Sequence, residues 1–204
     1  MQSLLDLLGS IFFGGAMLSI ILSANDIANE NQSVYNGDLL VQEMLVQTAY
    51  LVEGEFRNMG VGVADNGQIV LAADTSAISF LYDTDRNGTP DTVTYTMGTT
   101  ADMAGTQNPD DRPLSRRVNT GTTARIGVVT TFQLRYLTRT GEVLTTPVAS
   151  HRLSEVHSVE ITMEVQNPYA VLSSGGEVVG TTDNALYSNT LWQQTRLASQ
   201  NSRR

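Results

Sequence analysis

The chain has 204 residues, and its 21 acidic residues outnumber 12 basic ones, all of them arginine, which gives a formal net charge of −9. This length favours one domain with an extension, or a single large β domain. The absence of cysteine excludes disulfides, thiolate nucleophiles and cysteine-based metal sites. The acidic balance argues against a nucleic-acid partner, because neutralising phosphates needs a basic surface.

The negative charge is concentrated at the start of the chain. Residues 1–56 contain seven acidic residues and no basic residue, whereas residues 57–204 carry 14 acidic residues against 12 arginines. We therefore expect two different kinds of structure, with a division near residue 60.

The first predicted element is an apolar helix. No charged residue occurs from Leu7 to Asn25, and a helix of that length spans roughly 28 Å, about the hydrocarbon core of a bilayer. No basic residue precedes it, although a signal peptide or an oriented anchor normally has one. Either a basic leader has been removed and Met1 is a mature N-terminus, or the segment is a single-pass anchor with a weak orientation signal. Gly14 and Gly15 mark close helix packing or a stretch that can melt.

The helical pattern continues to about Gly60, where the predicted helix 1–60 ends. One face of its second half repeats every three or four residues, which predicts an amphipathic helix. The residues of this face are Val41, Met44, Leu45, Thr48, Val52, Phe56 and Met59. The Asn36-Gly37 pair between the two halves is a turn or kink signal, and it predicts a bend.

From Ile69 the hydrophobic period changes to two, which predicts a half-buried antiparallel sheet within a β domain at 61–198. The alternating runs are Ile78–Tyr82, Val93–Met97, Phe132–Tyr136 and Val159–Val165. The Asn87-Gly88 and Thr140-Gly141 pairs predict hairpin turns. Residues 99–112 and 173–180 have loop composition, residues 185–198 fit either a last strand or a short helix, and residues 199–204 are expected to be a flexible tail. The fold class is therefore α+β: a long N-terminal helix packed on an antiparallel β domain.

Several segments, in this order, carry a resemblance to a known family. They are an Asp-rich hairpin at Phe80–Tyr95, a leucine–arginine strand at Pro113–Arg117, and the succession Val129–Tyr136, Gly141–Leu144 and Val156–Met163. Together with the helical N-terminus, they resemble the type IV filament superfamily of type IV pilins and type II secretion pseudopilins. The likeness is greatest to W-type minor pilins and J-type pseudopilins, and it covers about residues 1–166.

This resemblance implies a pilin-like fold and a structural subunit of an extracellular filament. Such a subunit is held in the inner membrane before assembly, and it then polymerises through its apolar helix with copies of itself or with other pilin-like subunits. The resemblance assigns assembly roles to Met1, as a processed and methylated N-terminus, to Asp6, and to Gly14 and Gly15. In the family an early carboxylate, usually at the fifth residue, meets the N-terminal amine of a neighbouring subunit. Asp6 is the only acid before Asp26, so it is the candidate here.

The sequence contains one main candidate for a ligand-binding site, a calcium site. Asp83, Asp85, Asn87, Thr89 and Asp91 match the first nine positions of an EF-hand loop, with Gly88 at the sixth position, although Thr94 stands where the last acid is expected. Oxygen ligands on one tight turn suit Ca²⁺. The alternative is an ordinary hairpin turn in which Asp and Asn form local hydrogen bonds.

The sequence does not indicate an enzyme. It contains no phosphate-binding loop, nucleophile elbow or metalloprotease helix, and its two histidines lie in no catalytic pattern. The filament subunit is the first functional hypothesis. The second is a membrane-anchored extracellular module whose β domain binds or adheres to a ligand, and a membrane-tethered enzyme is a weaker third.

Overall fold

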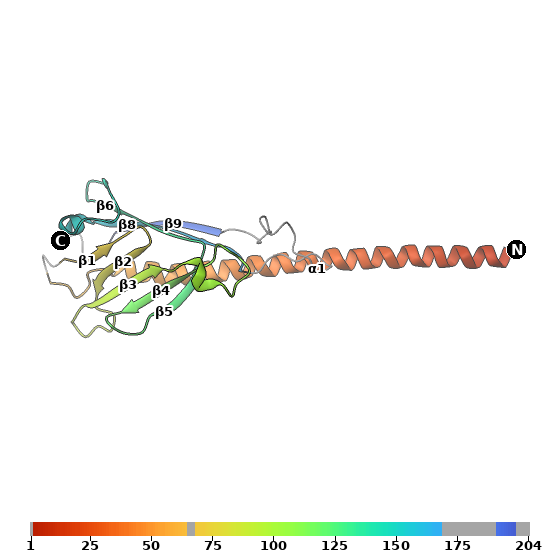
Figure 1. Ribbon diagram of the computed structural model, residues 1–204, viewed down its shortest axis with the longest axis horizontal. Helices are drawn as coiled ribbons and strands as arrows, with labels where there is room; N and C mark the ends of the chain where they lie inside the picture. Colours follow the sequence, from red (N-terminus) through yellow and green to blue (C-terminus); the bar gives the residue numbers. More distant parts are fainter. Residues whose placement is uncertain (1, 65–67, 169–190, 199–204) are drawn as a thin grey trace.

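The computed structural model describes residues 2–64, 68–168 and 191–198. One helix, α1 (Gln2–Arg57), extends away from a β domain that surrounds only its C-terminal end (Figure 1). The predicted fold class, a long N-terminal helix on an antiparallel β domain, is confirmed. The expected flexible tail at 199–204 and the expected loop at 173–180 lie outside the described residues.

The helix is continuous, so the bend expected at Asn36-Gly37 is wrong. Both residues lie inside α1, and no sharp bend is visible there (Figure 1). A glycine weakens a helix by about 1 kcal/mol but does not remove a backbone hydrogen bond, as proline does. The helix can therefore pass through the pair.

The helix ends close to the predicted Gly60 because the chain needs left-handed backbone there. Gly60 and Gly62 have φ values of +81° and +84°, which glycine adopts without steric cost. The Gly60 amide donates to the Leu81 carbonyl at 2.7 Å, and the Asp83 amide donates to the Val61 carbonyl at 2.9 Å. These two bonds join the helix end to the second strand.

The strands form two antiparallel sheets rather than the single sheet expected. The first has the order β1-β2-β3-β4-β5 and the second has the order β7-β6-β8-β9. The strands of the first sheet are β1 (Val70–Ala73), β2 (Ala77–Tyr82), β3 (Asp91–Met97), β4 (Arg112–Val118) and β5 (Ala124–Val129). Those of the second are β6 (Thr131–Leu137), β7 (Val143–Leu144), β8 (Ser158–Val165) and β9 (Leu191–Ala198). Two 3₁₀ helices, η1 (Thr100–Met103) and η2 (Ser150–Glu155), lie in the connections.

The chain passes from one sheet to the other at Thr130, without a reversing turn. β5 ends at Val129 and β6 begins at Thr131, while the Thr130 amide donates to the Glu164 carbonyl of β8 at 2.9 Å. Hydrophobic alternation gives the face of each strand but not its neighbours. For this reason the alternating runs were predicted correctly and their division into two sheets was not.

One hydrophobic core joins the helix to both sheets. Val41, Val52 and Phe56 of α1 are fully buried in it. The Phe56 ring lies 5.2 Å from the ring of Phe80 on β2 and 5.4 Å from that of Tyr95 on β3, with edge-to-face geometry. Each such aromatic pair contributes about 1 kcal/mol beyond the area it buries. The amphipathic face predicted for the second half of the helix is therefore the face that holds the domain.

Candidate functional site

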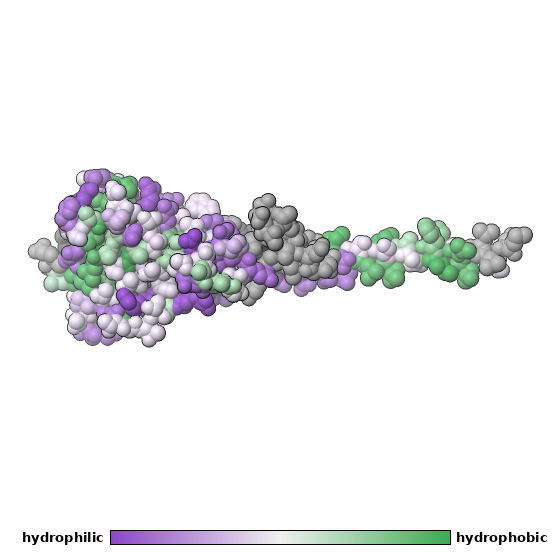
Figure 2. All heavy atoms as spheres, viewed as in Figure 1, coloured by the Kyte–Doolittle hydropathy of each residue, from purple (hydrophilic) through white to green (hydrophobic). Residues whose placement is uncertain are grey.

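The N-terminal half of α1 is an exposed apolar surface. Residues 10–29 are all exposed, and large side chains such as Phe12 and Phe13 have exposed fractions of 73% and 71%. One 18-residue window has a mean hydropathy of 2.0, and none of it is buried. Figure 2 shows this part of the helix as an apolar rod outside a mostly polar domain. The helix is long and apolar enough to cross a membrane, and the described domain covers none of this window.

The sequence-predicted assembly residues lie on this surface, apart from Met1, which is outside the described residues. Asp6 is exposed. Gly14 and Gly15 are helical, and a Cβ at either position would meet no atom of the described residues within 4 Å, apart from the adjacent backbone of the helix itself. The space beside both glycines is therefore open to another helix.

A second apolar stripe runs along the free side of the domain half of α1. Its members are Tyr35, Leu39, Val46 and Tyr50, with exposed fractions from 48% to 84%. Their spacing of four, seven and four residues equals that of the buried Val41, Leu45, Val52 and Phe56. At 100° per residue the two stripes lie about 120° apart around the helix. Sequence reasoning missed this outer stripe because the inner one already explained the helical period.

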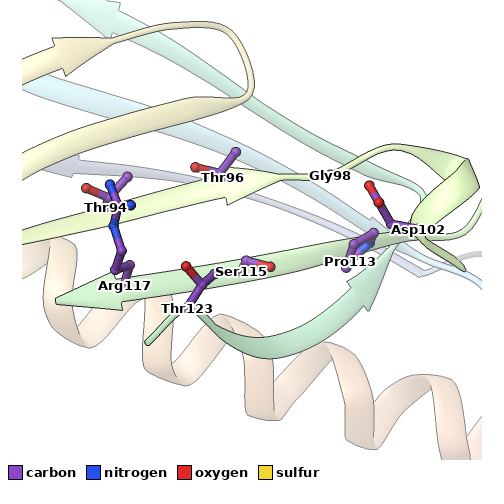
Figure 3. A pocket seen from close by; sticks show the side chains of 8 residues that line it. All are labelled: Thr94, Thr96, Gly98, Asp102, Pro113, Ser115, Arg117 and Thr123. Carbon is purple, nitrogen blue, oxygen red and sulfur yellow. The ribbon is translucent and has the colours of Figure 1, made fainter. Parts of the chain in front are cut away.

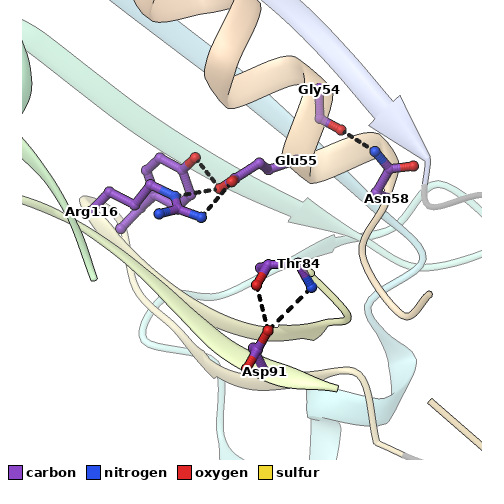
Figure 4. A network of polar contacts seen from close by, with 7 residues as sticks. Gly54, Glu55, Asn58, Thr84, Asp91 and Arg116 are labelled. Carbon is purple, nitrogen blue, oxygen red and sulfur yellow. Dashed lines mark hydrogen bonds and ion pairs between the residues drawn. The ribbon is translucent and has the colours of Figure 1, made fainter. Parts of the chain in front are cut away.

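An ion pair with a phenol fixes the helix against the first sheet. The Glu55 carboxylate of α1 accepts hydrogen bonds from Nε and Nη2 of Arg116 on β4, at 2.8 and 2.6 Å, and from the Tyr95 hydroxyl at 2.5 Å (Figure 4). The Glu55 and Arg116 side chains are only 13% and 22% exposed. Burial, and then the nearby charge of Glu55, raises the pKa of Tyr95, which therefore stays a neutral donor.

The neighbouring acid, Glu53, fixes the other side of the helix to the second sheet. Its carboxylate accepts hydrogen bonds from Gln193 Nε2 at 2.7 Å and from the Thr195 hydroxyl at 2.8 Å, both on β9. The sequence left 185–198 open between strand and helix. The inward residues of β9 include Gln193 and Thr195, whereas Trp192 faces outward and is 65% exposed. Because polar residues face inward here, the sequence of β9 shows no hydrophobic alternation that would have identified it as a strand.

The candidate calcium residues lie on the β2–β3 hairpin. Ligand oxygens of Asp83, Asp85 and Asp91 all lie within 4.8 Å of one another. Turn groups already bond all three acids. Asp83 accepts the Asn87 and Gly88 amides at 3.1 and 2.9 Å, Asp85 accepts the Asn87 backbone and side-chain amides, and Asp91 accepts the Thr84 hydroxyl and amide. The Asn87 side-chain oxygen accepts the Thr89 amide at 2.7 Å. These local hydrogen bonds of the turn are enough to explain why Asp and Asn occur at these positions, without a bound ion.

The calcium hypothesis stays a prediction with a direct test. If Ca²⁺ binds the three carboxylates of the hairpin, millimolar calcium should raise the melting temperature of the wild-type chain, because ligand binding stabilises the folded state. An Asp85→Asn variant should show a smaller rise in melting temperature, because it lacks one of the three carboxylates. The variant should still fold, since the Asp85 side chain is exposed and bonds only within the turn. Equal melting temperatures in calcium and in chelator would favour the ordinary turn.

A buried carboxyl lies next to β4. Asp111 is 1% exposed, and neither of its carboxylate oxygens accepts a hydrogen bond within the described chain. Burial, and to a smaller extent the charge of Asp110, raises the pKa of Asp111 above its ordinary value of 3.8. The folded state therefore binds this proton more tightly than the unfolded state does.

We expect the Asp111 carboxyl to make the protein less stable as pH rises. Its raised pKa means that the destabilisation begins near the ordinary value of 3.8 and is complete above the folded-state pKa. Asp111→Asn, which cannot ionise, should have a higher melting temperature than the wild type at pH 7, and the difference should shrink toward pH 4. Melting curves across this range test it, with Asp26→Asn, at an exposed carboxylate of α1, as the control. A difference that does not vary with pH would contradict it.

No protein-family model, no curated protein and no solved structure matches this chain.

Proposed function

We propose that this protein is a structural subunit of a type IV pilus-like or pseudopilus filament. It polymerises through the apolar half of α1 with copies of itself or with related subunits. The observation that carries the proposal is the exposed apolar rod at residues 10–29, continuous with a helix that is fixed in the domain. Burial of apolar surface contributes about 25 cal/mol per Å², so this rod is stable only in a membrane or among other helices. The membrane holds the subunit before assembly, and the β domain lies outside the cell.

The assembly residues support this proposal chemically. Gly14 and Gly15 permit close approach of a neighbouring helix, as small residues do at helix interfaces in membranes. Asp6 would enter an apolar helix bundle as a carboxylate, and a buried carboxylate needs a positive partner. The resemblance supplies that partner as the N-terminal amine of a neighbouring subunit.

The alternative is a membrane-anchored binding or adhesion module. A single-pass anchor needs about 20 apolar residues, which residues 7–25 already provide. It gives no reason for the apolar outer stripe to continue through Val46 to Tyr50, beyond the length of a membrane span. Packing against further helices in a filament does give a reason, and we therefore favour the filament.

Two neighbouring positions separate these functions experimentally. Val46→Glu places a charge on the outer stripe, whereas Gln47→Glu adds the same charge about 100° away around the helix. Both positions are exposed, so both variants should fold and enter the membrane. Electron microscopy should show filaments for the wild type and for Gln47→Glu, and few or none for Val46→Glu. Equal polymerisation of the two variants would favour the anchored module.

A further inference from the structure

A pocket lies on the face of the first sheet that points away from α1. In the β3–β4 pair, Thr94 lies opposite Arg117 and Thr96 lies opposite Ser115. The residues between them, Tyr95 and Arg116, point inward and bond Glu55. The outward residues, with Thr123 and Asp102, line a pocket of about 460 Å³ (Figure 3). This volume lies within the range of small-molecule sites.

The polar groups of this pocket are largely unused by the protein. Within the described part of the chain, the Arg117 guanidinium forms no hydrogen bond or ion pair, in contrast to the neighbouring Arg116. The hydroxyls of Thr96, Ser115 and Thr123 likewise form no hydrogen bond to described residues, and Thr94 shares one with Ser79 at 2.9 Å. The pocket therefore offers one planar cation and several hydroxyls to a ligand.

A fixed carboxylate completes the other end of the pocket. Oδ2 of Asp102 accepts the amide and the hydroxyl of Thr99, both at 2.8 Å, which leaves Oδ1 as an acceptor. These bonds lower the pKa of Asp102, so the group is ionised at neutral pH. Gly98 packs closely against this end, because a Cβ there would lie 2.7 Å from Cγ of Pro113 and 3.0 Å from Oδ2 of Asp102.

We propose that this pocket binds a small hydroxylated carboxylate of the sugar-acid class. The planar guanidinium of Arg117 matches a carboxylate with two parallel hydrogen bonds. Side-chain hydroxyls donate and accept, so Thr96, Ser115 and Thr123 match the hydroxyls of a sugar ring. One ligand hydroxyl donates to Asp102. A neutral sugar would offer Arg117 no negative charge, and an inorganic phosphate would bring more negative charge toward Asp102 than a carboxylate does.

Titration of the full-length chain in detergent micelles with glucuronate tests this site, with glucose and acetate as reference ligands. We expect glucuronate to shift the backbone amide resonances of β3 and β4, and to bind more tightly than either reference. Arg117→Gln should weaken glucuronate binding by at least about tenfold, because it removes the charge-assisted hydrogen bonds to the carboxylate. Arg139→Gln, at an exposed arginine in the β6–β7 turn, should bind like the wild type.

Four results would overturn the proposal. If acetate binds as tightly as glucuronate, the pocket is only an anion contact. If glucose does so, Arg117 has no role in recognition. If no ligand shifts the resonances, or if Arg117→Gln binds glucuronate unchanged, the site does not exist as described. The fold of Arg117→Gln is checked by its melting temperature, which we expect to be unchanged because the side chain is exposed.

Discussion

Replacement of Glu55 by alanine should lower the free energy of unfolding by about 3 kcal/mol. The change leaves the Arg116 guanidinium and the Tyr95 hydroxyl without their common acceptor at the helix–sheet contact. Removal of one partner of a buried ion pair typically costs 3–5 kcal/mol, and the partial exposure of Arg116 places the expected value at the lower end. Chemical denaturation of the full-length chain measures the loss.

The matched control is Glu43→Ala on the same helix. Glu43 is exposed and accepts a hydrogen bond from Nε2 of the exposed Gln47 at 2.8 Å, so this variant should lose well under 1 kcal/mol. A triple variant, Glu55→Leu with Arg116→Met and Tyr95→Phe, should regain most of the stability, because it removes all three polar groups of the network and apolar pairs often replace buried ion pairs without loss. Equal losses for Glu55→Ala and Glu43→Ala would show that the network does not hold the helix.

Replacement of Met17 by arginine should abolish filaments without unfolding the domain. Met17 lies near the middle of the apolar run and is 70% exposed, so it contributes nothing to the core. An arginine at the centre of a membrane helix costs about 2.5–3.5 kcal/mol on insertion scales, which is about a 100-fold change in partition.

Carbonate extraction of membranes should show a smaller inserted share for Met17→Arg, and electron microscopy should show no filaments. Met17→Leu is the control, and it should insert and polymerise like the wild type. The melting temperature of the domain should be the same in all three proteins. Normal filaments from Met17→Arg would mean that the apolar rod is not the assembly surface.

The sequence predicted the parts of the fold that follow from a local period. β2, β3, β6 and β8 alternate over most of their length, and their inward apolar residues, such as Phe80, Tyr95 and Leu134, are buried. β5 was missed because Ala124–Val129 does not alternate, and only Val129 is buried. The Glu55–Arg116 pair joins residues 61 positions apart, and no local pattern shows which of the charged residues will meet.

The two candidate sites also differed in how far the sequence could predict them. The hairpin acids lie within nine residues, so their convergence was predictable from the turn. The pocket at Arg117 depends on the register between β3 and β4, together with the position of Asp102 in η1. Arg116 and Arg117 are adjacent in the sequence, but neighbouring residues of a strand point to opposite faces. Arg116 therefore points inward to Glu55, and Arg117 points outward to the pocket.

The contacts of Glu53 affect the order in which parts of this protein fold during its synthesis. Its partner Gln193 lies 140 residues later in the chain. The helix α1 is therefore synthesised long before β9, the strand that completes its contacts. Contacts this distant in sequence form slowly. During that interval the inner side of the helix at Glu53 and the open edge of β8 are both unpaired, and exposed strand edges promote aggregation. A chain interrupted before residue 191 would keep its apolar rod but have an incomplete domain, and quality-control proteases would meet it in that state.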